Sequence, residues 1–153
     1  MKKFFMSMIA LIGLILPVSQ ANAAFNYPET INSIVHLSSV DFEENVISGT
    51  GFLISADGLI LTNAHTVLDM NTEEPYNNLW ICLIDNEYTV PDCRYEGEIF
   101  AYSRYWNLAL ISPAYELDEK GNRIGEYIGE TENFGLPYVE LADYDPSIGD
   151  NLS

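Results

Sequence analysis

The sequence predicts an all-β protein, built as an antiparallel barrel or sandwich. Short runs of alternating or apolar residues follow one another at even spacing, and turns containing Asp, Asn and Gly separate them. Helical periodicity is scarce, which disfavours a fold of alternating strands and helices. The 153 residues are 48% hydrophobic and 12% aromatic, which provides enough apolar surface for one folded domain.

The expected strands follow one another in chain order. Residues 33–40 alternate and are rich in β-branched side chains. Two turns are expected, at Ala56-Asp57-Gly58 and at Asp85-Asn86, and each lies between two apolar runs. The further strands are expected at residues 49–55, 59–63, 79–84, 87–94, 98–102 and 108–111. One short helical turn is expected at residues 64–68, directly after a strand.

The composition changes between residues 112 and 135, where Glu, Gly, Asn and Lys replace the apolar runs. We expect a long solvated surface connection there, because polar segments without periodicity form loops. Residues 136–141 then resume an alternating pattern.

The first residues have the three parts of a secretory signal peptide. Two lysines precede an uncharged apolar run over residues 4–18, and Ala21-Asn22-Ala23 supplies small residues before a cleavage site. The run is short for a membrane-spanning helix, which needs about 20 residues. We therefore expect residues 1–23 to direct export by the Sec route and to be removed. Residues 24–153 would then fold in the periplasm, in the medium or at the cell surface, whereas an uncleaved signal would anchor the chain to the membrane.

The charge of the chain disfavours one class of partner. There are 23 acidic and 6 basic side chains, so the formal net charge is -17. Phosphate backbones and anionic lipid headgroups are bound through clustered Lys and Arg. Nucleic-acid binding is therefore not expected.

Cys82 and Cys93 are the only cysteines in the sequence. In an exported protein such a pair favours a disulfide, and two ligands alone cannot complete a zinc site. If Asp85-Asn86 is a two-residue hairpin turn, however, antiparallel pairing sets Cys82 opposite Thr89, too far from Cys93 for a bridge. A longer loop, a bulged pairing and free cysteines therefore all remain open.

The two histidines have different settings. His36 lies within an alternating run and is expected to be an ordinary strand residue. His65 stands at a strand-to-helix junction, after a Gly-x-Gly segment and a tight turn. A histidine in that place is held rigidly while its ring points out at the rim, which suits a general base.

Residues 49–67, which read GTGFLISADGLILTNAHTV, closely resemble the stretch around the catalytic histidine of trypsin-like serine peptidases. The resemblance is nearest to the bacterial HtrA/Deg-like branch. It continues in the family's order: residues 81–88 resemble the next hairpin, 106–111 a segment that usually reads Asp-Leu-Ala-Leu-Leu, and 136–150 the stretch before the second barrel. It implies the first six-stranded antiparallel β-barrel of a two-barrel peptidase, incomplete in this chain.

The resemblance also implies roles for two residues. His65 would be the general base, and Asn107 occupies the position of the aspartate that orients the histidine ring. A carboxylate fixes the catalytic tautomer, whereas an amide can also donate and favour the other one, and this exchange lowers kcat about 10⁴-fold in trypsin-like enzymes. No Gly-x-Ser-Gly-Gly segment occurs, so the nucleophilic serine is absent from this chain, and the chain alone is expected to be inactive.

Three functional hypotheses follow. The preferred one is an exported trypsin-like serine endopeptidase that acts on peptide or protein substrates without a cofactor or a metal, represented here by an N-terminal fragment. The first alternative is a non-catalytic, peptidase-like binding module, which the substitution at Asn107 favours. The second alternative is an unrelated acidic extracellular β-barrel that binds cations. Residues 69–74 carry oxygen ligands at alternating positions but lack the glycine of a calcium loop, so we expect a solvated loop there.

Overall fold

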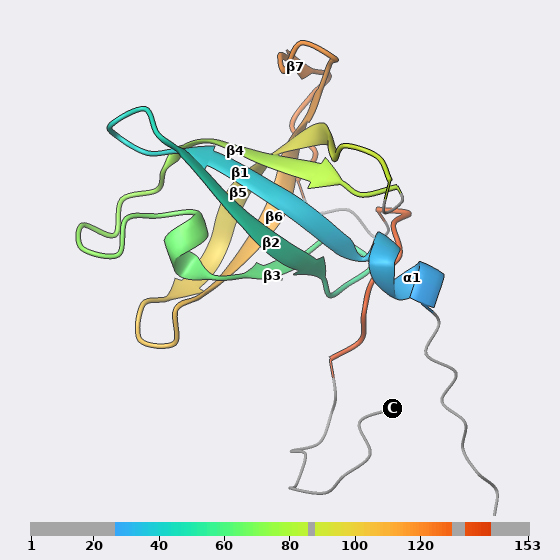
Figure 1. Cartoon of the computed structure of the whole chain (residues 1–153), viewed down its shortest axis with the longest axis horizontal. Coiled ribbons are helices and arrows are strands. Elements are labelled where there is room, and N and C mark those ends of the chain that lie inside the picture. The colour runs from blue at the N-terminus through green and yellow to red at the C-terminus, as the bar shows by residue number, and fades with distance from the viewer. Residues whose placement is uncertain (1–26, 86–87, 130–133, 142–153) are drawn as a thin grey trace, which may run out of the picture.

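The computed structural model describes residues 27–85, 88–129 and 134–141, which form a closed barrel (Figure 1). Within these ranges, the strands β1 to β6 pair antiparallel in the order β3-β2-β1-β4-β5-β6. The pairing of β3 with β6 closes the barrel. The bounds are β1 Ile34–Val40, β2 Val46–Leu53, β3 Ile60–Thr62, β4 Asn77–Leu83, β5 Asp92–Ser103 and β6 Leu108–Leu117. A short strand β7, Arg123–Ile124, extends the sheet beyond β6. The predicted all-β fold with a six-stranded antiparallel barrel is confirmed.

Alternate residues of the strands fill the barrel interior. Val35 and Leu37 of β1 are fully buried, and Ile60 of β3 lies opposite Ile111 of β6, where the barrel closes. The core cluster also contains Leu53, Ala64, Val67, Leu79, Ile81, Leu83 and Ala109. Because successive side chains of a strand point to opposite faces, burial of one face produces the alternation seen in the sequence.

The expected hairpin turn at Asp85-Asn86 is wrong. β4 ends at Leu83, which pairs with Asp92 at the start of β5, so a longer loop connects the two strands. Residues 88–91 of the strand expected at residues 87–94 therefore belong to this loop, and residues 92–94 lie in β5. Short-range turn chemistry misled the prediction, because an Asp-Asn pair also occurs inside longer loops.

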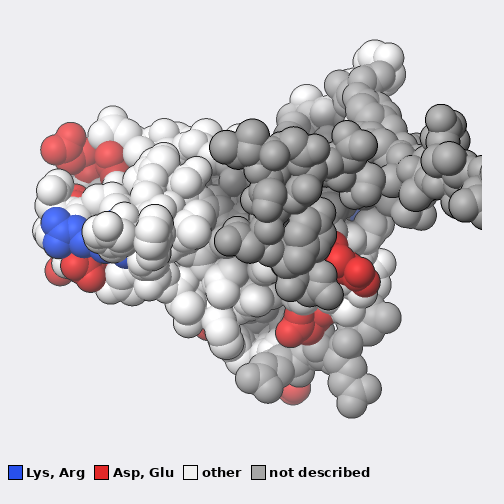
Figure 2. All heavy atoms as spheres, turned by 90° about the horizontal axis from the view of Figure 1, so that it is seen from below, with Lys and Arg blue, Asp and Glu red and all other residues white. Residues whose placement is uncertain are grey.

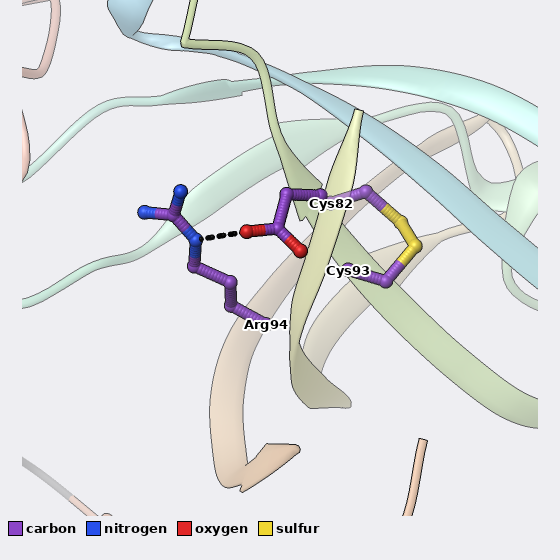
Figure 3. Close-up of a disulfide and its surroundings, with 4 residues drawn as sticks. Cys82, Cys93 and Arg94 are labelled. Carbon is purple, nitrogen blue, oxygen red and sulfur yellow. Dashed lines mark hydrogen bonds and ion pairs between the residues drawn. A yellow bond between two sulfur atoms is a disulfide. The ribbon is translucent and has the colours of Figure 1, made fainter. Parts of the chain in front are cut away.

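The longer loop brings Cys82 and Cys93 opposite each other, and the structure joins them in a disulfide (Figure 3). A register shift next to Cys82 marks a bulge in this pairing. Arg94 follows Cys93 on β5, and its side chain extends on the other side of the strand from the disulfide (Figure 3). It pairs with Asp92 at 2.7 Å and with Asp85 at 2.9 Å. The disulfide and the two ion pairs together hold both ends of the β4–β5 loop.

The surface connection expected over residues 112–135 is wrong at its start. β6 continues to Leu117, and β7 folds back to pair with its last residues. The alternating residues 136–141 do not form a strand, although Val139 donates its N–H to the carbonyl of Leu53 at 2.9 Å.

Pro113 lies inside β6, in the stretch where the change in composition predicted a loop. A proline has no N–H to donate to a sheet ladder. Here Pro113 pairs with Gly97 next to a register shift in β5. Prolines are tolerated at such bulges, because the ladder is already interrupted there.

A short helix, α1 (Tyr27–Asn32), precedes β1 and was not predicted from the sequence. Six residues are too few to show a helical period. The residue after the helix, Ser33, is buried and donates its hydroxyl to the carbonyl of Thr30 at 2.7 Å. In the described part of the chain, no helix has the length and apolar character needed to cross a membrane. The expected signal peptide at residues 1–23 and the segment 142–153 lie outside the described residues.

Candidate active site

His65 lies on η1 (Ala64–Thr66), a 3₁₀ turn that directly follows β3. Ala64 and Thr66 on either side of it are buried, whereas His65 itself is exposed. The buried hydroxyl of Ser39 donates to the carbonyl of Thr66 at 2.7 Å and ties the turn to β1. The core thus holds the backbone of His65 while the ring stands at the rim of the barrel.

Two glycines of β2 allow this arrangement. A Cβ atom at Gly49 would lie 2.3 Å from Cγ2 of Thr66, and one at Gly51 would lie 2.5 Å from Cγ2 of Ile60. Both separations are far shorter than van der Waals contact, so any side chain at these positions would push η1 or β3 away. The Gly-x-Gly segment of the sequence therefore serves the close packing of the turn that carries the histidine.

Asn107 lies at the end of the turn between β5 and β6, where its φ of 51° places it in the left-handed region. Asparagine and aspartate adopt this conformation more readily than most residues. The carbonyl of Asn107 accepts the N–H of Ala64 at 3.1 Å and the side-chain amide of Asn63 at 3.1 Å. The β5–β6 turn is therefore hydrogen-bonded to the turn that carries His65 (Figure 1).

The side chain of Asn107 contacts His65 at both its backbone and its ring. Oδ1 of Asn107 accepts the backbone N–H of His65 at 3.1 Å. The ring atom Nδ1 lies 3.1 Å from Oδ1 and 2.9 Å from Nδ2 of the same amide. Because a backbone N–H needs an acceptor, this contact determines which end of the amide is the oxygen.

The amide leaves two hydrogen-bonding states open for the ring. When Nδ1–H of His65 donates to Oδ1 of Asn107, Nε2 keeps a lone pair and can act as a base. When Nδ2–H of Asn107 donates to Nδ1, Nε2 carries the proton and cannot accept another. A carboxylate at this position would only accept, and would therefore select the first state.

Other candidate groups do not reach the ring. Among the described residues, no carboxylate and no serine hydroxyl makes a hydrogen bond or ion pair with His65. Two acids upstream of Asn107 in sequence have other partners, since Glu98 accepts the hydroxyl of Tyr127 and Asp92 pairs with Arg94. His36 lies in β1 as expected, with Thr50 and Cys82 as its strand neighbours. The structure thus unites His65 with Asn107, and within the described ranges no serine hydroxyl or cysteine thiol forms a contact with either side chain.

The loop over residues 69–74 was expected to be a solvated loop, and it also forms hydrogen bonds within itself and with the β5–β6 hairpin. Oδ1 of Asp69 accepts the N–H groups of Asn71 and Thr72, and Glu73 contacts Tyr102 and Arg104 on β5 and its turn. The pKa of Tyr102 is raised, because its hydroxyl donates to the negatively charged Glu73. No local sequence signal distinguishes Glu73 from the other acids of the loop, and it was missed for that reason. Nowhere in the described ranges do three His, Cys, Asp or Glu side chains gather to hold a metal ion.

An apolar row crosses the outside of the barrel next to this site. Phe52, Leu61, Leu110 and Ala101 are successive partners in the register of β2, β3, β6 and β5. A hollow of about 410 Å³ lies over the Leu61, Leu110 and Ala101 part of this row, and Leu141 contributes to its lining. Figure 2 views the barrel from the side of β3 and the β5–β6 turn, and it shows a broad uncharged area with charged residues at its edges.

Comparison with known proteins gives one family match. The family model described as a trypsin-like peptidase domain matches residues 49–152. No curated protein matches the chain.

Two solved structures similar to this chain belong to one bacterial protease. The active form of the Rv3671c protease from M. tuberculosis is 28% identical over 55% of this chain and 31% of its own, with a TM-score of 0.42. An inactive serine-to-alanine mutant of Rv3671c is 25% identical over 65% of this chain and 43% of its own, with a TM-score of 0.40. The chain therefore spans less than half the length of these two structures.

The family match covers both parts of the candidate site. It begins at Gly49, runs through His65 and Asn107, and covers more than half of the sequence. The family match confirms the resemblance to trypsin-like peptidases found in the sequence. The chain belongs to the family of trypsin-like peptidase domains.

Proposed function

We propose that this chain is the N-terminal part of an exported trypsin-like serine endopeptidase, to which it supplies the general base His65. The observation that carries the proposal is the contact between His65 and Asn107 at the rim of the barrel, inside the family match. The substrates would be peptides or proteins, and the reaction would need no cofactor.

In this reaction, Nε2 of His65 removes the proton from a serine hydroxyl as the serine oxygen attacks the peptide carbonyl. The imidazolium then gives that proton to the departing amine, and water releases the acyl group by the same route. Asn107 contributes when its Oδ1 accepts Nδ1–H and keeps the lone pair on Nε2. The serine belongs to a segment outside this sequence, so the chain by itself does not turn over peptides.

The uncharged outer face supports a further barrel as the source of the serine. The row from Phe52 to Ala101 exposes apolar side chains in a protein with a net charge of -17. Exposed apolar patches of this kind mark surfaces that another domain or protein covers. A second barrel packed there would bring its nucleophile toward the neighbouring His65.

Export is supported by two independent features. Residues 1–23 have the pattern of a signal peptide, and Cys82 and Cys93 form a disulfide. Structural disulfides form and persist in oxidising compartments outside the cytosol. We therefore place the mature protein in the periplasm, in the medium or at the cell surface.

A second candidate function is a non-catalytic, peptidase-like binding module. The distance of 2.9 Å between Nδ2 of Asn107 and Nδ1 of His65 favours it, because an amide that donates there disables Nε2 as a base. The third hypothesis, an unrelated barrel that binds cations, is contradicted by the family match, since the chain belongs to the trypsin-like peptidase domains.

Covalent labelling separates the two candidate functions. In a longer form of the protein that includes the nucleophile, a serine-directed phosphonate should label the serine, and His65→Ala should abolish the labelling. If the folded longer form is not labelled, the peptidase proposal fails. A binding module should instead retain peptide binding after His65→Ala.

A further inference from the structure

A second contact joins the segments that carry His65 and Asn107, and it lies away from both side chains. Glu73 belongs to the loop between η1 and β4, where its φ is 61°. Its Oε2 accepts the hydroxyl of Tyr102 at 2.9 Å, and its Oε1 accepts Nη1 of Arg104 at 3.3 Å. Tyr102 lies on β5, and Arg104 lies on the turn that follows. The carboxylate of Glu73 therefore contacts both the strand and the turn of the β5–β6 hairpin that carries Asn107.

The loop of Glu73 is attached to the turn of His65. The carbonyl of Val67 accepts the N–H of Tyr76 at 2.9 Å, and Leu68 forms a β-bridge with Pro75. The N–H of Leu68 in turn donates to the carbonyl of Ala64 at 3.0 Å. These backbone hydrogen bonds connect the position of the loop to the position of η1.

The turn of the hairpin is attached to Asn107 in the same way. The carbonyl of Arg104 accepts the N–H of Asn107 at 3.3 Å, while its side chain is held by Glu73. Arg104 thus links Glu73 to Asn107 through a single residue. The contacts form a closed path that runs from His65 through the loop and Glu73 to Asn107 and back to His65.

The geometry points to Glu73 as a positioning residue for the His65–Asn107 pair. Its carboxylate holds the β5–β6 turn against η1, so that Oδ1 of Asn107 stays on the backbone N–H and the ring of His65. The importance of this role for catalysis rests on the proposed peptidase function. The contacts themselves do not depend on it.

The effect of Glu73 is local. The side chains of Glu73 and Arg104 are 39% and 55% exposed, and an ion pair so exposed contributes little to global stability. The pairing of β3 with β6 holds the hairpin in the barrel without Glu73. Removal of the carboxylate should therefore loosen the turn without unfolding the chain.

Amide hydrogen exchange in the 153-residue chain tests this role directly. The backbone N–H groups of Ala64 and His65 donate to the carbonyl and to Oδ1 of Asn107, so their protection reports the attachment of the turn. In Glu73→Ala, both amides should exchange about threefold to tenfold faster, while the amides of β1 stay unchanged. The ring ¹⁵N shifts of His65 should move toward those of a free imidazole.

Two further variants separate position from charge. Glu73→Gln keeps an oxygen for the hydroxyl of Tyr102 and should restore most of the protection. Glu74→Ala removes one negative charge from the same loop, and the side chain of Glu74 makes no hydrogen bond or ion pair with the described residues, so protection should remain at the wild-type value. Tyr102→Phe should reproduce part of the effect of Glu73→Ala.

Unchanged exchange at Ala64 and His65 in Glu73→Ala would overturn the role of Glu73. Equal acceleration in Glu74→Ala, or at every amide of the barrel, would do the same. Because exchange is measured without substrate, a longer form that fails to react with the phosphonate would contradict the peptidase proposal and leave the positioning result intact. In an active longer form, Glu73→Ala should lower kcat more than it changes KM, and Glu73→Gln should recover part of the loss.

Discussion

Oδ1 of Asn107 accepts the backbone N–H of His65 at 3.1 Å, and the same amide lies against Nδ1 of the imidazole ring. One side chain therefore does two things. It fastens the β5–β6 turn to the histidine turn, and it contacts Nδ1 of His65 as either acceptor or donor, which leaves both tautomers of the ring open. A carboxylate would keep the first contact and change the second, which makes this position the most informative one to mutate.

Asn107→Asp should activate a longer, nucleophile-bearing form of the protein. Aspartate accepts Nδ1–H and cannot donate to it, and its left-handed backbone conformation is tolerated as well as that of asparagine. We expect kcat/KM to rise by up to about 10⁴-fold, measured with a peptide substrate or as the rate of phosphonate labelling. Asn107→Ala is the matched control and should not activate, because it lacks an acceptor. An Asn107→Asp protein no faster than wild type would contradict the assigned role.

Gly49→Ala should destabilise the barrel and displace His65. The added methyl group would overlap the side chain of Thr66, which adjoins the histidine in η1. Overpacking of this kind costs about 1–3 kcal/mol, measurable as a lower free energy of unfolding in urea. Thr50→Ala, at an exposed position of the same strand, should have a smaller effect. Equal losses in the two variants would argue against close packing as the reason for the glycine.

Reduction of the Cys82–Cys93 disulfide should lower stability without abolishing the fold. The bridge closes a short loop, with 11 residues of sequence separation, and such a closure contributes about 3 kcal/mol by the chain-entropy estimate. Urea unfolding with and without a reductant measures the difference. The double variant Cys82→Ala, Cys93→Ala should be insensitive to the reductant, and a wild-type protein equally insensitive would show that the bridge contributes nothing.

Two carboxylates should make the stability decrease in acid. The pKa of Asp118 is lowered by hydrogen bonds from Asn122, and the pKa of Asp41 is lowered in the same way by Asn45. A group whose pKa is lower in the folded state stabilises the fold above its unfolded pKa of about 3.9, and this contribution is lost as the pH falls through the folded pKa.

Thermal midpoints measured from pH 6 down to about pH 2 test this expectation. The Asp118→Asn protein should lose less stability over that range than wild type, since an amide oxygen still accepts but does not titrate. Glu119→Gln is a matched control in the same turn and should follow the wild-type curve. A wild-type slope in Asp118→Asn would contradict the expectation.

The residues that local chemistry governs were predictable. Alternation located β1, and the apolar runs on either side of Ala56-Asp57-Gly58 located β2 and β3, because a buried face and a tight turn are properties of neighbouring residues. The same local pattern, with its Gly-x-Gly segment, singled out His65. Local rules failed at two places. They predicted a loop where β6 continues through Pro113 at a bulge, and they predicted a hairpin turn at Asp85-Asn86 where β4 and β5 are joined by a longer loop.

The sequence by itself determined that this chain is an all-β trypsin-like domain with His65 at a strand-to-helix junction. The family resemblance indicated Asn107 as the neighbour of that histidine, and only the tertiary structure decided the geometry of their contact. Three features depend on which strands are neighbours and in what register they pair. These are the contact of the Asn107 amide with His65, the contacts of Glu73 with the β5–β6 hairpin, and the pairing of Cys82 with Cys93. Barrel closure through β3 and β6 brings His65 and Asn107, 42 residues apart in sequence, within hydrogen-bonding distance. No local pattern encodes such a contact, because its geometry is set by the packing of the whole core.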